Sequence, residues 1–193
     1  MLHRYIPLLV LLACHVAGQP VEDAREALEA EVAVPKGRFS FKQAREALET
    51  ACHSPVSPTH EALCWNDRGL WHQLQGQYAE AETMYARAVS GFEKAPLINQ
   101  RLLATTLHNL GATYRELHRL EDAKQVLSHA LALRRDAYGE EHPLTVNTLG
   151  QLGTVHLAAG ELTRAEAFLQ SAVSAHERFL PPPTRIVFQA FTT

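Results

Sequence analysis

The chain has 193 residues, of which 46% are hydrophobic, so it is long enough to bury a core as one medium domain or as a short repeat array. Its formal net charge of −3 is small and its acidic and basic residues are intermixed along the sequence. This argues against a nucleic acid, or an anionic membrane surface, as the partner.

The first eighteen residues have the pattern of an export signal. Arg4 precedes an apolar run at 5–13, and small residues lead up to Gly18. The run is shorter than the roughly 20 residues of a membrane-spanning helix. Three interpretations stay open: cleavage after Gly18, a lipoprotein signal that ends before Cys14, whose preceding Leu-Leu-Ala resembles a lipobox, or a buried N-terminal helix. We expect an exported protein, periplasmic or secreted, that contacts a membrane only if Cys14 carries a lipid.

Beyond this segment the chain has two cysteines, Cys52 and Cys64, on either side of a short proline-containing turn at 54–58. In an oxidising compartment, an even number of cysteines favours a disulfide. Free thiols are the alternative. A zinc site that also uses His53 and His60 is a third interpretation, although this spacing matches no structural zinc motif.

Three glycines, Gly69, Gly111 and Gly153, recur at a single fixed interval, and such a constant period indicates a repeat array. Small residues recur twelve and nineteen positions after each glycine, and a bulky residue recurs after sixteen. Apolar residues within each repeat are spaced by three and four, which predicts two amphipathic helices per repeat. We expect Gly111 to face Ala123 where the two helices of a pair meet.

This pattern resembles the tetratricopeptide repeat (TPR) family, with three units at 62–95, 104–137 and 146–179. The 42-residue period and the Tyr-Gly-Glu-Glu-His-Pro segment at 138–143 are similar to the kinesin-light-chain subgroup. The first unit has Arg68 where the other two have leucine, which predicts more exposed packing there. The resemblance implies an all-α fold, a right-handed α-solenoid of antiparallel helix pairs.

Both ends of the array depart from the repeat. Residues 21–53 are predicted to form a degenerate N-terminal helical hairpin, as terminal repeats are atypical. Residues 181–193 begin with three prolines and continue as an incomplete helix that stops before its glycine. This apolar end has three interpretations: it folds back on the last repeat, it joins a second copy, or the gene is truncated.

The resemblance also implies that an extended peptide or a helix binds along the concave face formed by the first helix of each repeat. Carried over by register, it nominates the polar residues of that face: Asn66, Asp67, Thr105, His108, Asn109, Arg115, Asn147, Gln151 and Thr154. Asparagine both donates and accepts hydrogen bonds, so it can bind a peptide backbone whatever the peptide's sequence. Ordinary solvated side chains are the alternative. Some TPR proteins clamp a chaperone's terminal carboxylate with cationic residues, which are missing here, so we do not expect that activity.

No motif in the sequence indicates catalysis, such as a phosphate loop, a dinucleotide fingerprint or a nucleophile elbow. His72 and His156 occupy the position of Tyr114 in the middle repeat, so we expect them to pack between helices. We therefore predict an adaptor or scaffold that binds a protein or peptide and needs no cofactor or metal. A self-assembling structural protein that uses its open C-terminal face is the alternative.

Overall fold

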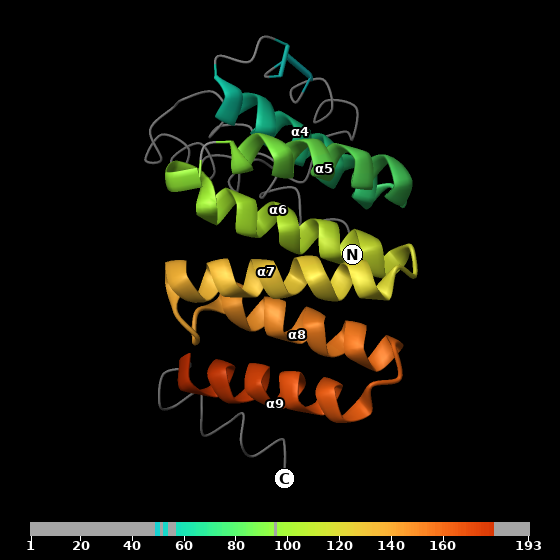
Figure 1. Ribbon diagram of the computed structural model, residues 1–193, viewed down its shortest axis with the longest axis vertical. Helices are drawn as coiled ribbons and strands as arrows, with labels where there is room; N and C mark the ends of the chain where they lie inside the picture. Colours follow the sequence, from blue (N-terminus) through green and yellow to red (C-terminus); the bar gives the residue numbers. More distant parts are fainter. Residues whose placement is uncertain (1–48, 51, 54–56, 95, 180–193) are drawn as a thin grey trace, which may run out of the picture. The chain divides into compact units, whose positions relative to one another are not determined.

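The computed structural model describes residues 49–50, 52–53, 57–94 and 96–179. The predicted signal, nearly all of the predicted hairpin at 21–53 and the C-terminal segment 181–193 lie outside these residues. Within them the chain forms helices and no strand (Figure 1). The helices are α4 (Pro58–Leu74), α5 (Tyr78–Glu93), α6 (Pro96–Glu116), α7 (Leu120–Tyr138), α8 (Pro143–Ala158) and α9 (Leu162–Phe179).

The chain divides into two compact units, residues 1–91 and 92–193, and each is described by itself. In the second unit, α6 packs on α7, α7 on α8 and α8 on α9, and α6 also contacts α8 directly. This sequential stacking of helices is the predicted all-α solenoid. The long repeat period lengthens the helices: α6 has 21 residues and begins at Pro96, well before the predicted unit at 104–137.

Helices α4 and α8, each the first helix of its pair, begin with the same sequence features. Each has a proline in its first turn, where the missing N–H costs nothing and the fixed φ suits a helix. The residue before each helix then accepts a hydrogen bond from a free backbone amide. Ser57 Oγ accepts from the His60 amide at 3.1 Å, and His142 Nδ1 accepts from the Leu144 amide at 3.2 Å.

The turns within the helix pairs need a left-handed residue. Gly76 and Gly160 supply it after α4 and α8, each with φ of 75°. After α6 the same place is taken by His118 with φ of 58°. Histidine is among the non-glycine residues enriched in this region, so the middle repeat turns without a glycine.

Each helix pair is held by a contact between its repeat glycine and the bulky residue sixteen positions later. A methyl group added to Gly69 or Gly153 would lie 2.7 Å from the facing side chain, and one added to Gly111 would fall on a leucine. The contacting pairs are Gly69–Tyr85, Gly111–Leu127 and Gly153–Leu169. The sequence predicted that Gly111 faces Ala123. The three atoms nearest to a methyl on Gly111 all belong to Leu127, which lies on the same helix as Ala123.

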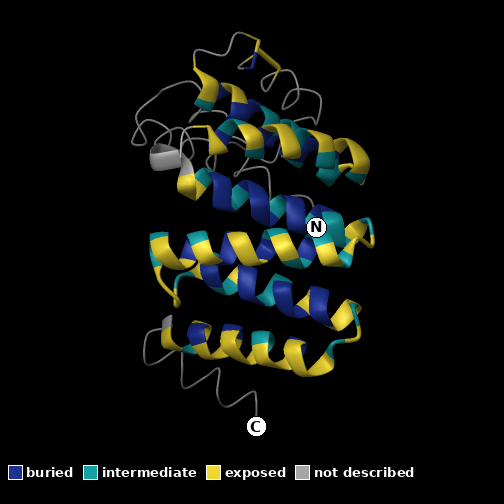
Figure 2. Cartoon of the chain, in the orientation of Figure 1, coloured by how far each residue is buried: buried dark blue, intermediate teal, exposed yellow. Residues whose placement is uncertain are grey.

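The core of the second unit lies between α7, α8 and α9. Its buried members are small or aliphatic: Ala123, Leu127, Leu131, Leu149, Leu152, Val155 and Ala172. Figure 2 shows buried residues running along α6 and α8, whereas α9 is largely exposed. Burying one such leucine contributes about 1.5–3 kcal/mol, so these contacts dominate the stability of the stack.

In the first unit, Cys52 and Cys64 form a disulfide with their Cα atoms 5.6 Å apart. Both cysteines are buried. Among the described residues no three side chains of the metal-binding types come together. Arg68 is partly exposed, pairs with Glu49 at 2.8 Å and lies 5.0 Å from the centre of the Trp65 ring. The charged side chain thus finds partners at the surface, at a position where the other repeats have a leucine.

We predict that Gly111→Ala lowers the free energy of unfolding by about 1–3 kcal/mol, because its Cβ would overlap the fully buried Leu127 side chain. Gly150→Ala is the matched control, since a Cβ there meets nothing within 4 Å. It should raise the stability by about 0.5–1 kcal/mol through better helix propensity. Urea unfolding measures both, and equal effects of the two variants would contradict the proposed contact.

We also predict that reducing Cys52–Cys64 destabilises the first unit by about 2–4 kcal/mol, because an unfolded chain without the crosslink gains conformational entropy. Both tryptophans of the chain, Trp65 and Trp71, lie in α4, so their fluorescence follows this unit. The variant with both cysteines changed to serine should unfold as the reduced protein does and ignore the reductant. An intact mass that stays the same on reduction would rule out the disulfide.

Candidate protein-binding face

The predicted binding residues of the second unit lie on α6 and α8, the first helices of two consecutive pairs. Because these helices contact each other, their side chains share one surface, here named the α6–α8 face. Asn147 and Thr154 are exposed, and the partly buried members are Thr105, Asn109, Arg115 and Gln151. The structure thus brings together six of the nominated residues.

Arg115 connects the two helices across this face. Its Nη1 donates to Gln151 Oε1 at 2.7 Å and lies 3.4 Å from Thr154 Oγ1. Its Nη2 pairs with Glu116 at 2.6 Å. The guanidinium is therefore already engaged by a carboxylate and by amide and hydroxyl oxygens, and the face around it is close to neutral.

Two asparagines on the same face are free to bind. Within the described part of the chain, neither the Asn109 nor the Asn147 side-chain amide has a hydrogen-bond partner. Thr105, by contrast, donates its hydroxyl to the Arg101 carbonyl one turn earlier, at 3.1 Å. The two amides are the groups that can both donate to and accept from an added backbone.

His108 lies beneath the face instead of on it. Its side chain is buried, with Nδ1 3.4 Å from Thr148 Oγ1. Burial, with the charges of Arg134 and Arg115, lowers the pKa of His108 to about 3. The imidazole is therefore neutral throughout the physiological range, and the expected exposed histidine is part of the helix packing.

Arg134 of α7 completes this buried network, and it is not among the residues nominated from the sequence. Only 2% of the residue is exposed, and its Nη1 donates to the Leu144 carbonyl at 2.8 Å and to Thr148 Oγ1 at 2.6 Å. Burial lowers its pKa to about 10, and no carboxylate pairs with it within the described residues. Arg134 follows Leu127 and Leu131 at helical spacing, which places it on the same buried face of α7. This spacing is the sequence pattern that predicts its burial.

The two nominated residues of the first unit differ from the rest. Asn66 and Asp67 are both buried, and the Asn66 amide donates to Asp67 Oδ1 at 3.1 Å. Burial raises the pKa of Asp67 to about 7. These two side chains therefore hydrogen-bond to each other in the interior of the first unit and are not exposed to a peptide.

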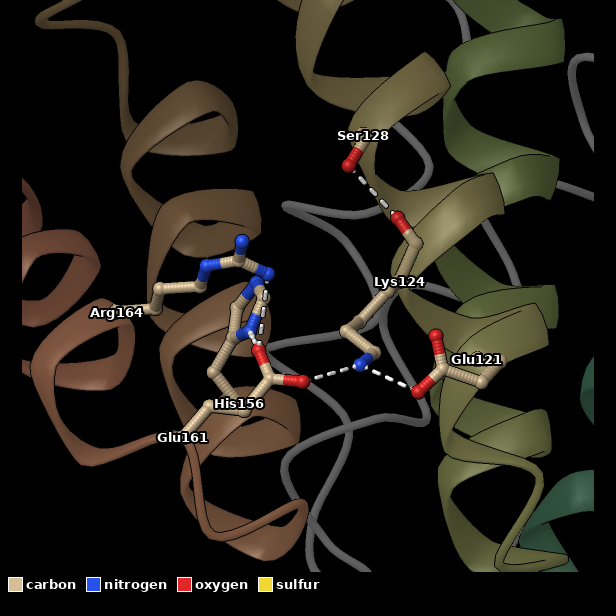
Figure 3. Close-up of polar contacts among 6 residues, drawn as sticks. All are labelled: Glu121, Lys124, Ser128, His156, Glu161 and Arg164. Atoms are coloured by element: carbon tan, nitrogen blue, oxygen red, sulfur yellow. Dashed lines mark hydrogen bonds and ion pairs between the residues drawn. The ribbon is translucent and has the colours of Figure 1, made fainter.

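A charged cluster fixes the turn between α8 and α9 against α7 (Figure 3). Glu161, in this turn, accepts from Lys124 of α7 at 2.7 Å and from His156 of α8 at 2.7 Å, and Arg164 lies 3.3 Å away. The hydrogen bonds from Lys124 and His156 lower the pKa of Glu161 to about 2. His156 itself is buried and stacks on Phe168, in the packing role expected for it.

One position near the end of the first helix contacts one position in the following turn in every helix pair, although the residue types differ. In the first repeat, His72 Nδ1 lies 2.7 Å from Gln77 Oε1. In the middle repeat, the Arg119 guanidinium sits 4.4 Å from the centre of the Tyr114 ring. These positions precede His156 and Glu161 by one or two repeat periods, so a contact from the first helix to the turn is a regular feature of the array.

The family model of the tetratricopeptide repeat matches residues 59–136 and 102–178, more than half of the chain. The chain belongs to the tetratricopeptide repeat family. None of the curated proteins matches it. The TPR helices of the described part include none that is both long and apolar enough to cross a membrane.

Solved structures agree with this TPR assignment. BtubC (BKLC) from P. vanneervenii superposes with a TM-score of 0.68 at 16% identity, over 94% of this chain and 69% of that one. A putative kinesin light chain from Podospora anserina, with nearly identical TPR-like repeats, gives 0.62 at 19% identity, over 76% of this chain and 73% of that one. Such identities show the fold alone, and that fold is the predicted all-α solenoid of TPR repeats.

We predict that Glu161→Gln lowers the melting temperature at neutral pH, because the amide loses the ion pair with Lys124. The pKa of Glu161 is about 2 when folded and about 4.5 when unfolded, so the ionised form stabilises the fold above pH 4.5. This contribution is lost as the pH falls from about 4.5 towards 2. The difference in melting temperature between wild type and variant should therefore shrink over this range, and a difference independent of pH would contradict the ion pair.

Proposed function

We propose that this protein is an exported adaptor or scaffold that binds a protein segment along the α6–α8 face. The TPR fold is a scaffold for protein–protein interaction, and its kinesin-light-chain-like relatives share this non-catalytic architecture. What this chain adds is a particular arrangement of polar groups on its first helices.

The observation that carries the proposal is the pair of unengaged amides, Asn109 and Asn147, on the face that the Arg115–Gln151 bridge crosses. An extended peptide presents backbone donors and acceptors, and each amide offers one group of either kind in return. The bridge holds α6 and α8 together, so the amides need little reordering when a peptide binds. Because the Arg115 cation is already paired with Glu116, it is a poor anchor for an acidic group, and we expect a Kd of about 1 μM, or about −8 kcal/mol.

Export is the second part of the proposal. The pattern of residues 1–18 supports it, with cleavage after Gly18 or a lipid on Cys14 as the two routes. The Cys52–Cys64 disulfide supports it independently, because such bonds persist in oxidising compartments. The mass of the N-terminal peptide of the mature protein distinguishes the two routes from each other and from an uncleaved chain.

We predict that changing both Asn109 and Asn147 to alanine weakens partner binding by about 1–3 kcal/mol, since two hydrogen bonds are lost. Affinity capture from the envelope fraction, with wild type and variant compared, measures this and identifies the partner. The matched control changes Gln125 and His129, two exposed residues of α7, to alanine and should bind as wild type does.

Equal recovery of a partner by both double variants would show that the partner does not bind through the two asparagines of the α6–α8 face. It would still be consistent with an adaptor function. Recovery of the protein alone, in equal amounts for all three forms, would favour the self-assembling structural role instead. Recovery by wild type and by the α7 variant, but not by the asparagine variant, is the result we expect.

A further inference from the structure

The Tyr-Gly-Glu-Glu-His-Pro segment at 138–143 joins α7 to α8, and its histidine is the N-cap of α8. The first amides of a helix have no partner within the helix, and His142 Nδ1 accepts from the Leu144 amide at 3.2 Å. Serine, threonine, aspartate and asparagine are the usual residues at this position. Histidine differs from all four because its charge changes between about pH 5 and 8.

The capping hydrogen bond of His142 requires a neutral imidazole. A ring nitrogen that accepts a hydrogen bond carries no proton, whereas a protonated ring has an N–H on both nitrogens and no acceptor. Protonation would therefore break the contact with the Leu144 amide. It would also place a positive charge at the N-terminus of α8, where the helix dipole disfavours a cation.

The turn before α8 is positioned by contacts that do not need the imidazole. Pro143 restricts the preceding residue to extended backbone, and His142 has φ of −65° and ψ of 138°. Thr145 Oγ1 donates to the Gly139 carbonyl at 2.8 Å. The ring itself stacks on Tyr138 with the centroids 4.5 Å apart. Another capping side chain can therefore replace the imidazole on the same backbone.

The two carboxylates next to His142 in the sequence are already paired with arginines. Glu140 pairs with Arg135 of α7 at 2.7 Å, and Glu141 pairs with Arg178 of α9 at 3.1 Å. Within the described residues neither forms an ion pair with His142. These carboxylates therefore do little to compensate a charge on the imidazole.

The other charged groups around this turn are cationic. Helix α6 contributes Arg101, whose guanidinium lies 5.1 Å from the centre of the Tyr138 ring on which the histidine stacks. Helix α7 contributes the buried Arg134, which donates to the Leu144 carbonyl. Helix α8 contains one ionisable side chain, His156, in its last turn. The surroundings of the cap thus favour the neutral ring.

We propose that His142 is an acid-sensitive N-cap, which holds the first turn of α8 when it is neutral and releases this turn when it is protonated. Because the folded turn requires the neutral ring, its stability falls as the pH falls through the range in which histidine titrates. Asn147 lies in the next turn, so acid would also loosen this end of the α6–α8 face. That consequence rests on the proposed function, whereas the cap itself does not.

Hydrogen exchange of the full chain at about pH 8 and about pH 5 tests the cap, with each rate divided by the intrinsic rate at that pH. Mass spectrometry reads it on peptides from 144–149. The variant His142→Ser keeps a capping oxygen that does not titrate, as Ser57 does for α4. At the higher pH both proteins should exchange alike. At the lower pH wild type should exchange about fivefold faster, the factor that the loss of an N-cap typically produces.

Two further variants complete the experiment. His142→Asn also caps without titrating, so it repeats the test should the serine variant fold poorly. His129→Ser is the matched control, because it removes an exposed histidine of α7 that caps no helix, and it should keep the wild-type response to acid.

An equal response to acid in wild type and in the two His142 variants would overturn the proposal. So would an acceleration in wild type that extends equally to core peptides from 123–131, since that pattern reports unfolding of the whole unit. These measurements involve no partner, so their outcome is separate from that of the affinity capture.

Discussion

The contact that the rest of the structure depends on is the one between a repeat glycine and the bulky residue sixteen positions later. Without a side chain on Gly111, the Leu127 side chain can lie directly against the backbone of α6. The same contact recurs at Gly69 and Gly153, so the two helices of each pair approach in the same way. Regular pairs can then stack, and the stacking of α7 on α8 buries Leu131 and Leu149.

Spacing along each helix was enough to predict the helices, because a buried stripe repeats with the helical period. The constant period of the glycines indicated the repeat array and its family. The spacing did not identify Leu127 as the residue whose side chain lies nearest to Gly111, since Ala123 and Leu127 lie on the same stripe one turn apart. Burial of His108 was missed for a different reason. Its partner Thr148 belongs to the next repeat, and the pattern of a single helix carries no information about such a neighbour.

The polar contacts of the second unit have two distinct effects. The cluster around Glu161 joins α7, α8 and the turn before α9, and thereby fixes how successive repeats are placed. Arg115 joins α6 to α8 at the surface. Both reduce the freedom of the helices that form the α6–α8 face. A rigid face loses little entropy when a partner binds, so a few hydrogen bonds suffice for a moderate affinity.

Arg134 connects the buried network to this surface. Its guanidinium bonds the Leu144 carbonyl and the Thr148 hydroxyl, which lie on either side of Asn147 in the first turns of α8. A buried cation without a carboxylate is costly, and these two bonds are the compensation that the described residues provide. The start of α8 is therefore held by a charged group that has little freedom to move. Because Asn147 belongs to this turn, Arg134 of α7 fixes its position on the face from beneath. The order of the exposed Asn147 amide therefore depends on the buried network.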